Sequence, residues 1–118
     1  GPASVRYPRG GGSQTSITKN NEKIEIGKSR LIRTSNTQKV GILSFGSCLD
    51  LSMDVGSELD ATVVDMNFVK PLDTHRILEV ASKHKLIVTI EENTLKGGAG
   101  SAVSEFLAEV DQKISILN

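Results

Sequence analysis

From residue 38 onwards, short and mainly apolar runs alternate with longer amphipathic stretches. The runs are rich in Val and Ile and cover residues 40–43, 62–66, 86–90 and 114–117. Runs that are apolar at consecutive positions are typical of strands covered on both faces, as in a parallel sheet. The stretches between them, 47–59, 73–84 and 101–111, are then expected to be helices that form right-handed crossovers. The pattern predicts an α/β domain with a mostly parallel, mixed sheet and helices on both faces.

The predicted helix over residues 73–84 has the clearest beginning. Asp73 belongs to the residue types that cap the free amides of a first helical turn. Leu72 before it and Ile77 after it have the spacing of a hydrophobic staple. The buried face of this helix is expected to consist of Leu72, Ile77, Val80 and Ala81.

The other two helices are predicted from the spacing of their apolar residues. Ser101 is the expected cap of the last helix, and its apolar residues recur at i, i+3, i+4 and i+7. These residues are Val103, Phe106, Leu107 and Val110. The stripe expected for the first helix consists of Cys48, Leu51, Val55 and Leu59. Gly56 weakens that first helix, because Gly costs about 1 kcal/mol relative to Ala in a helix interior.

The residues before position 38 lack a sustained apolar run. Residues 1–9 contain a short extended segment over 4–7, and residues 10–37 are rich in Gly, Ser, Thr and Asn, as in an interdomain linker. Within this linker, residues 23–26 alternate between polar and apolar, which predicts a half-buried strand. Residues 30–33 are a second candidate strand, and the turn-forming residues 35–37 are expected to fold it against the next strand as a hairpin.

Composition and charge exclude several classes of protein. The 14 basic and 14 acidic residues cancel and are interspersed, which argues against nucleic acid or a membrane surface as the main partner. A single cysteine, Cys48, excludes an internal disulfide and suits a reducing compartment. No stretch approaches the roughly 18 apolar residues that a membrane span needs. We expect a soluble, intracellular chain.

Arg6 and Arg9 are the first candidate site. A guanidinium group is permanently charged and offers a planar fork of donors that matches phosphate or carboxylate. Both residues flank a Tyr-Pro step that favours extended backbone, and Gly10 to Gly12 follow. Because side chains alternate along a strand, Arg6 and Arg9 are expected to face different ways, so that one of them meets an anion. An interdomain salt bridge is the competing interpretation.

The glycine-rich residues 97–101 are the second candidate. They follow a predicted strand and open a predicted helix, an arrangement in which backbone amides can hold a phosphate. The G-x-G-x-x-G fingerprint is not met, and small residues here equally permit close packing. Glu91 and Glu92 end the preceding strand, and adjacent residues on a strand point to opposite faces. A joint acid–base role for these two carboxylates is therefore not expected.

The remaining reactive side chains form no recognisable constellation. His75 and His84 are nine residues apart at the two ends of one predicted helix, a spacing that matches no metal site, and solvated helix ends are expected. Cys48 has no companion that would make it a nucleophile, so a small core residue is expected. No catalytic constellation is visible in the sequence.

Several short motifs occur in an order that resembles a known enzyme family. They are Arg6-Tyr7-Pro8-Arg9-Gly10, residues 26–28, residues 42–46, residues 65–73, and residues 91–93 followed by 97–101. Together they closely resemble the 1-deoxy-D-xylulose-5-phosphate synthases, which are transketolase-like enzymes that use thiamine diphosphate. The resemblance runs over nearly the whole chain.

The resemblance implies a synthase that condenses pyruvate with glyceraldehyde 3-phosphate, with loss of carbon dioxide, for isoprenoid and thiamine precursors. It implies a homodimer in bacterial cytoplasm or plastid stroma, with thiamine diphosphate and Mg²⁺ bound by residues that this chain lacks. The catalytic residues are likewise implied to lie elsewhere. Within this chain, the resemblance implies that Arg9, in preference to Arg6, contacts the phosphate of glyceraldehyde 3-phosphate.

The resemblance also divides the chain. Residues 1–9 correspond to the end of the pyrimidine-binding domain, 10–37 to the linker, and 38–118 to an incomplete C-terminal domain that is chiefly structural and partly a dimer contact. Both ends are expected to be cut, because Asn118 directly follows the last predicted strand, where an open sheet normally continues into a covering helix. The isolated chain is expected to be inactive and to expose an apolar face.

Two alternatives remain open from the sequence. The chain is also compatible with the C-terminal domain of a transketolase or of a 2-oxo-acid dehydrogenase β-subunit, although residues 70–73 together with 6–10 match the synthase better. From a different class, a stand-alone module that binds a nucleotide through residues 97–101 is the other alternative.

Overall fold

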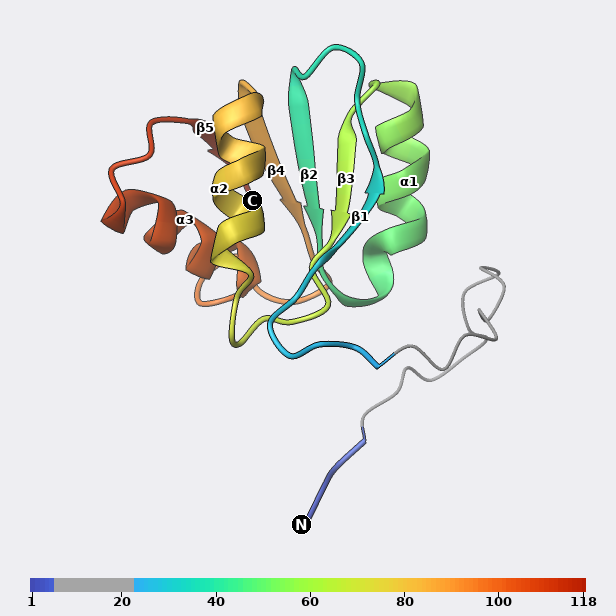
Figure 1. Cartoon of the computed structure of the whole chain (residues 1–118), viewed down its shortest axis with the longest axis vertical. Helices are drawn as coiled ribbons and strands as arrows, with labels where there is room; N and C mark the ends of the chain where they lie inside the picture. Colours follow the sequence, from blue (N-terminus) through green and yellow to red (C-terminus); the bar gives the residue numbers. More distant parts are fainter. Residues whose placement is uncertain (6–22) are drawn as a thin grey trace.

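The computed structural model describes residues 1–5 and 23–118. Its elements follow in the order β1 (Arg30–Arg33), β2 (Val40–Ser44), the 3-10 turn η1 (Gly46–Cys48), α1 (Leu49–Glu58), β3 (Thr62–Asp65), α2 (Thr74–Lys83), β4 (Leu86–Ile90), α3 (Ala99–Glu109) and β5 (Ser115–Leu117) (Figure 1). Apart from β1, strands and helices alternate, as the spacing of apolar runs predicts.

The strands form one five-stranded mixed sheet in the order β1-β3-β2-β4-β5. β2 is central and parallel to both of its neighbours, with Gly41 opposite Thr62 of β3 and opposite Ile87 of β4. β5 continues the parallel part beside β4, and β1 alone is antiparallel, on the outer edge of β3. The predicted fold class is confirmed.

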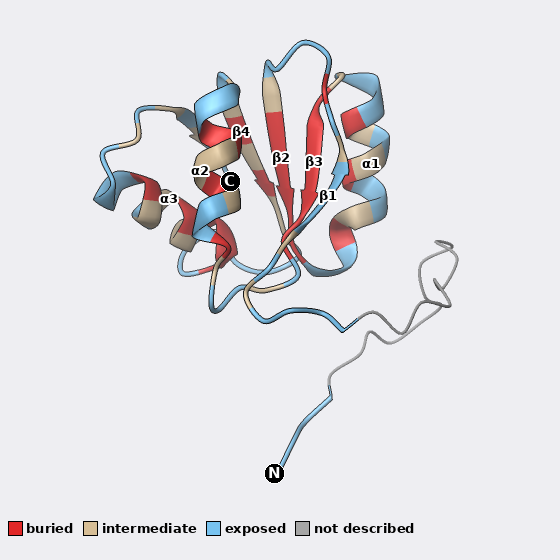
Figure 2. Cartoon of the chain, in the orientation of Figure 1, coloured by how far each residue is buried: buried red, intermediate tan, exposed pale blue. Residues whose placement is uncertain are grey.

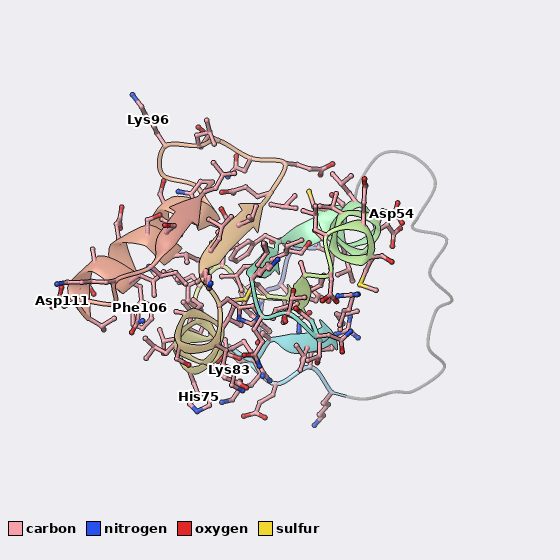
Figure 3. The ribbon with its side chains drawn as sticks, turned by 90° about the horizontal axis from the view of Figure 1, so that it is seen from above. Asp54, His75, Lys83, Lys96, Phe106 and Asp111 are labelled. Carbon is pink, nitrogen blue, oxygen red and sulfur yellow. The ribbon has the colours of Figure 1, made fainter. Side chains whose placement is uncertain are left out.

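The helices lie on both faces of this sheet. α1 packs against β2 and β3 on one face, whereas α2 and α3 pack against β4 on the other (Figure 3). Two apolar clusters follow from this division. The larger contains Leu43, Val64, Ile77, Ile87 and Val103 and lies under α2 and α3, and the smaller is centred on Ile42, Ala61 and Val63 under α1. The buried residues in Figure 2 follow the central strands and the inner sides of the helices.

The strand over Arg30–Arg33 is confirmed, but the predicted hairpin with the next strand is wrong. β1 pairs with β3, and Arg30 is opposite Asp65. Both edges of β2 are already taken by parallel strands, so the free edge of β3 is the place where β1 is added. Asp60 holds the segment between β1 and β2 in place, because its carboxylate accepts hydrogen bonds from Arg33 and from the backbone amides of Asn36 and Thr37.

The predicted strand over residues 23–26 is also wrong. These residues pair with no strand in the described part of the chain, and Ile24 and Ile26 are exposed. Gly27 has a φ of 73°, and the amide of Lys28 donates to the carbonyl of Glu25, so the chain turns here. Alternation of polar and apolar residues is compatible with a strand, but it does not specify the neighbouring strand with which these residues would pair.

The buried face of α1 agrees only in part with the predicted stripe, since Cys48 is buried and Val55 packs against the smaller cluster as predicted. Its fully buried residues are Ser52 and Gly56, whereas Leu51 and Leu59 are 57% and 55% exposed. The small residues face the sheet because the helix approaches it closely. A Cβ atom at Gly56 would lie 2.4 Å from Cγ2 of Val63 in β3.

α2 has the predicted cap and the predicted core residues. The side chain of Asp73 accepts a hydrogen bond from the amide of Arg76 at 3.1 Å. Ile77, Val80 and Ala81 are buried in the larger cluster, and Leu72 packs against it.

α3 begins two residues before the predicted cap, at Ala99, with Gly98 in the N-cap position. Val103 and Leu107 are buried as predicted, whereas Val110 lies beyond the end of the helix and is exposed. Ser101 is not the cap, because its hydroxyl donates to the carbonyl of Leu95 instead. No helix in the described part of the chain is long and apolar enough to cross a membrane.

Candidate functional site

The carboxyl ends of β2 and β4 form the place where an open α/β sheet usually holds a ligand. The chain leaves β2 towards α1 on one face and leaves β4 towards α3 on the other, which creates a crevice between the two loops. This crevice measures about 370 Å³, and its lining includes Phe45, Ser47, Val69, Glu92 and Gly97. The volume of the crevice falls within the range of small-molecule sites. The side chains that line it therefore decide which ligand it can hold.

Glu91 occupies the amino end of α3. Its two carboxylate oxygens accept hydrogen bonds from the backbone amides of Ala99, at 3.0 Å, and Gly100, at 2.8 Å. These are amides that a phosphate at this helix end would need. The carboxylate thus performs the capping function that the sequence assigned to Ser101.

Glu92 points to the opposite side of β4 and engages the other helix. Its carboxylate accepts a hydrogen bond from the hydroxyl of Ser47, which lies in the turn that leads into α1. The expected division of Glu91 and Glu92 between two faces is therefore confirmed. Each carboxylate links the end of β4 to the helix on its own face, and the two do not form an acid–base pair.

Within residues 97–101, close packing explains Gly98 and Gly100, whereas Gly97 has a φ of 76° and open space around it. A Cβ atom at Gly98 would lie 2.1 Å from the carbonyl oxygen of Thr94, and one at Gly100 would lie 2.5 Å from Oγ1 of Thr89. Neither position has room for a larger residue. The packing interpretation of these glycines therefore holds, and a phosphate would meet carboxylates where it needs donors.

The crevice does not fit the diphosphate of thiamine diphosphate. The amides of Ala99 and Gly100 donate to Glu91, that of Gly97 donates to Ser101, and Glu92 places a second carboxylate in the lining. Negative charges this close to a diphosphate repel it. Within the described residues, no three His, Cys, Asp or Glu side chains are grouped so that they could hold a metal ion.

Cys48 is a core residue, as predicted. Its side chain is buried where η1 joins α1. Burial raises the pKa of the thiol, and the negative charges of Glu92 and Glu91 raise it further. A thiol in this environment stays protonated at neutral pH and is a poor nucleophile.

The two histidines have different environments. His75 is exposed, as expected for a solvated helix end, and it points outward from α2 in Figure 3. His84 is half-buried, and the expectation of a solvated ring is wrong for it. Its Nδ1 lies 2.8 Å from the carbonyl oxygen of Val80, and its Nε2 lies 2.8 Å from Oγ1 of Thr62. The ring therefore ties the end of α2 to β3.

A smaller cavity lies between β1 and α2, next to this histidine. It measures about 100 Å³, and its lining includes Leu31, Arg76, Val80 and His84. Nε of Arg76 is buried without a hydrogen-bond partner among the described residues. A water molecule occupies about 30 Å³ in the liquid, so this space suits a few waters and is too small for a nucleotide.

Asp73 has a second role that the sequence did not indicate. Besides capping α2, its carboxylate accepts hydrogen bonds from the amide and the hydroxyl of Ser29, both at 2.8 Å. Burial by itself raises the pKa of Asp73, but the hydrogen bonds from Ser29 and Arg76 outweigh it and hold the pKa below its ordinary value. The segment before β1 is thereby attached to α2.

Arg6 and Arg9 lie outside the described residues. Their proposed contact with a phosphate stays a prediction from the sequence. The described residues contribute a scaffold in which acidic side chains cap helices or pair with arginines, as in Arg30–Asp65 and Arg33–Asp60.

Comparisons with known proteins place this scaffold in a family. The family described as transketolase, C-terminal domain, matches residues 27–118. The 1-deoxy-D-xylulose-5-phosphate synthase of Histophilus somni (strain 2336) is 53% identical over 116 residues, and that of Stutzerimonas stutzeri (strain A1501) is 56% identical over 108 residues. These alignments cover 98% and 92% of this chain, but only 18% and 17% of the relatives.

A solved structure has the same architecture. The protein titled "Split gene transketolase, inactive beta4 tetramer" superposes with a TM-score of 0.75 and 29% sequence identity. The match covers 82% of this chain and 33% of that chain. The chain thus spans about a fifth of the length of the curated synthases and about a third of this solved chain.

Proposed function

Because the chain belongs to the transketolase C-terminal domain family, we propose that it acts as the C-terminal domain of a 1-deoxy-D-xylulose-5-phosphate synthase. The observation that carries the proposal is the identity of 47–57% to curated synthases over nearly the whole chain. The solved transketolase is 29% identical, which favours the synthase over a transketolase.

The proposed reaction condenses pyruvate with glyceraldehyde 3-phosphate and releases carbon dioxide. Thiamine diphosphate supplies the electron sink when it is bound. The crevice at the end of β4 carries carboxylates and does not fit a diphosphate. The residues that bind thiamine diphosphate and Mg²⁺ are therefore proposed to lie in the rest of such a synthase. The product serves isoprenoid and thiamine precursor synthesis, in the cytoplasm of a bacterium or in a plastid.

The proposed role of this chain is positional. Residues 38–118 form a rigid α/β unit that supports the dimer, and Arg9 holds the phosphate of glyceraldehyde 3-phosphate. A guanidinium–phosphate pair can be bidentate and is charge-assisted, which contributes roughly 1.5–3 kcal/mol. Holding the acceptor in place increases the rate by proximity.

A chimeric enzyme tests the proposal. The 116 aligned residues of the Histophilus somni synthase are replaced by those of this chain, and formation of 1-deoxy-D-xylulose 5-phosphate is assayed. We expect activity within about tenfold of the parent enzyme, a difference of roughly 1.4 kcal/mol in transition-state stabilisation. A chimera that is folded, as judged by circular dichroism, but has no synthase activity would contradict the proposal.

The alternative of a nucleotide-binding module is tested on the isolated chain. Calorimetric titration with ATP, NAD⁺ and thiamine diphosphate is expected to give no binding, because Glu91 already accepts the amides of Ala99 and Gly100. Saturable binding of a nucleotide that is lost in the variant Gly98→Ala would favour the module instead.

A further inference from the structure

The cavity between β1 and α2 lies at a different place in the sheet from the crevice at the end of β4. Its lining includes Thr62, the first residue of β3, and Gln38, which lies shortly before β2. The cavity is therefore near the amino ends of these parallel strands. Reacting ligands of an open α/β sheet bind at the opposite, carboxyl ends. A ligand held in this cavity is therefore expected to act as an effector and not as a substrate.

Two cations and one carboxylate line this cavity from α2. Glu79 accepts a hydrogen bond from Nη1 of Arg76 through Oε2, and one from Nζ of Lys83, at 2.8 Å, through Oε1. The hydrogen bond from Lys83 and the charges of both cations lower the pKa of Glu79, so this carboxylate is ionised at neutral pH. Glu79 is the only acidic residue among the described residues that line the cavity. One positive charge is therefore left without a matching carboxylate.

The guanidinium group of Arg76 is only partly used. Its Nη1 donates to Glu79, whereas its Nε is buried and has no hydrogen-bond partner among the described residues. A buried donor that lacks an acceptor is destabilising. The edge formed by Nε and Nη2 is a planar fork of donors that matches the two oxygens of a carboxylate. What this edge lacks is an acceptor.

The wall that contains His84 does not supply that acceptor. The carbonyl of Val80 can only accept, so Nδ1 of His84 carries the proton, and Nε2 of the neutral ring accepts from the hydroxyl of Thr62. Oγ1 of Thr62 accepts in turn from the amide of Ser35, at 3.0 Å. These groups satisfy one another within the protein. An acceptor for Arg76 therefore has to come from a molecule in the cavity.

The remaining lining is aliphatic and sets the size of that molecule. Leu31 of β1 and Val80 of α2 both face the cavity, and Leu31 is 45% exposed at its rim. The cavity of about 100 Å³ corresponds to roughly three water molecules, at about 30 Å³ each. This space suits a molecule of about four to six non-hydrogen atoms that has one charged end and one apolar end.

We propose that this cavity binds a short-chain monocarboxylate, whose carboxylate pairs with the Nε–Nη2 edge of Arg76 and whose alkyl end packs between Leu31 and Val80. A phosphate is a poorer match, because its charged oxygens would lie against these two aliphatic side chains. A ligand this small binds weakly, with an expected Kd on the order of 1 mM. The inference does not depend on the reaction proposed above.

An NMR titration of this chain with propionate, at constant ionic strength, tests the proposal. The Nε–H resonance of Arg76 reports directly on a new acceptor at this edge. We expect it to shift saturably with a Kd on the order of 1 mM, together with the amide resonances of Leu31 and Thr34. Propionamide has nearly the same shape without the charge, and it is the matched control. We expect it to bind at least about tenfold more weakly, and inorganic phosphate to leave the Arg76 resonance in place.

Three variants locate the site. Arg76→Met removes the guanidinium and is expected to weaken propionate binding at least about tenfold. Arg30→Met also removes an arginine that pairs with a carboxylate, but it lies outside the cavity lining, so binding should stay within about twofold. Glu79→Gln removes the carboxylate that shares the guanidinium, and it is expected to strengthen binding by about threefold or more.

The opposite results would overturn the proposal. No saturable shift of the Arg76 Nε–H resonance at about 50 mM propionate, far above the expected Kd, would mean that the cavity holds water only. Equal binding of propionamide would remove the carboxylate contact, and displacement of propionate by phosphate would make this a general anion site. Weaker binding to Glu79→Gln would contradict the shared guanidinium. If Arg76→Met does not fold, as judged by circular dichroism, the titrations of the unsubstituted chain and of Glu79→Gln still decide. Because they use this chain alone, their outcome is separate from that of the chimeric synthase.

Discussion

Adjacent acidic residues at the end of a strand are easily taken for a catalytic pair, and Glu91 and Glu92 show a different use. Their side chains diverge because neighbouring positions on a strand face opposite sides of the sheet. Glu91 accepts two amides at the start of α3, and Glu92 accepts the hydroxyl of Ser47 before α1. These two adjacent residues thus attach the end of β4 to one helix on each face of the sheet.

Glu91→Ala is expected to destabilise the domain by about 1–2 kcal/mol, because it leaves two amides at the start of α3 without their acceptor. The free energy of unfolding is measured by urea denaturation. Glu92→Ala is the matched control, and we expect a loss of about 0.5 kcal/mol or less, since its partner hydroxyl lies at the surface. Equal losses in both variants would contradict the capping role of Glu91.

The stability contributed by Asp73 is expected to depend on pH. Its pKa in the folded chain lies below the ordinary value of 3.8, so the stabilisation is fully present above that value. It is lost as the pH falls through the folded pKa. Asp73→Asn should therefore cost on the order of 1 kcal/mol at pH 6 and progressively less below pH of about 4. Urea denaturation at several pH values checks this, with Asp54→Asn as a surface control, and a constant difference across the range would contradict it.

At the scale of elements, α1 shows why a periodic pattern alone can select the wrong face. Its sequence contains two stripes with helical spacing, one with Leu51, Val55 and Leu59 and another with the small residues Ser52 and Gly56. Apolar periodicity selects the first, of which Val55 packs against the sheet while Leu51 and Leu59 are exposed. The fully buried residues are those of the second stripe, because small residues allow close approach to β3. The distance between helix and sheet is a tertiary property that the sequence pattern does not contain.

Gly56→Ala is expected to destabilise the domain although Ala is the better helix former. The new methyl group would lie 2.4 Å from Cγ2 of Val63, and such overpacking costs about 1–3 kcal/mol, against a gain of about 1 kcal/mol in helix propensity. Thermal and urea unfolding measure the net loss. Ser57→Ala on the exposed side of the same helix serves as control, with a change within about 0.5 kcal/mol.

A double variant separates this clash from other effects of the glycine. In Gly56→Ala combined with Val63→Ala the clash is removed, so the pair should cost less than the sum of the two single changes. Strict additivity would mean that the glycine acts through the unfolded chain or through helix propensity alone.

The sequence predicted the parallel strands and helices well, because each is specified by its own local pattern and its own caps. The prediction was wrong where it had to choose which strands pair with each other. Residues 30–33 form a strand, yet they pair with β3 and not with β2, and residues 23–26 pair with no other strand that the structure describes. The site shows the same limit. Alternation along the strand predicted that the side chains of Glu91 and Glu92 diverge. The hydrogen bond from the amide of Ala99 to Glu91 was not predicted, because it depends on how the loop between β4 and α3 folds back.

At the scale of the whole molecule, the described residues resemble a support more than a reaction centre. The crevice at the topological switch point, where a ligand is expected in this type of sheet, contains the domain's own carboxylates. Cys48 is buried with a raised pKa, and His84 is held between α2 and β3. In the proposed synthase, we therefore expect this chain to contribute through its surfaces and through the predicted phosphate contact of Arg9.

Arg9→Ala in the chimeric synthase is expected to raise the KM for glyceraldehyde 3-phosphate by about ten- to hundredfold, which corresponds to loss of a charge-assisted pair worth roughly 1.5–3 kcal/mol. The KM for pyruvate should stay within about twofold, because pyruvate carries no phosphate. Arg9→Lys keeps the charge but loses the planar fork, so it should give an intermediate value. Arg6→Ala is the matched control, since its side chain is expected to face the other way. Steady-state kinetics with each substrate varied in turn distinguish the cases. A larger effect of Arg6→Ala would transfer the phosphate contact to Arg6, and equal increases for both substrates would remove both arginines from that role and leave the domain with a purely structural contribution.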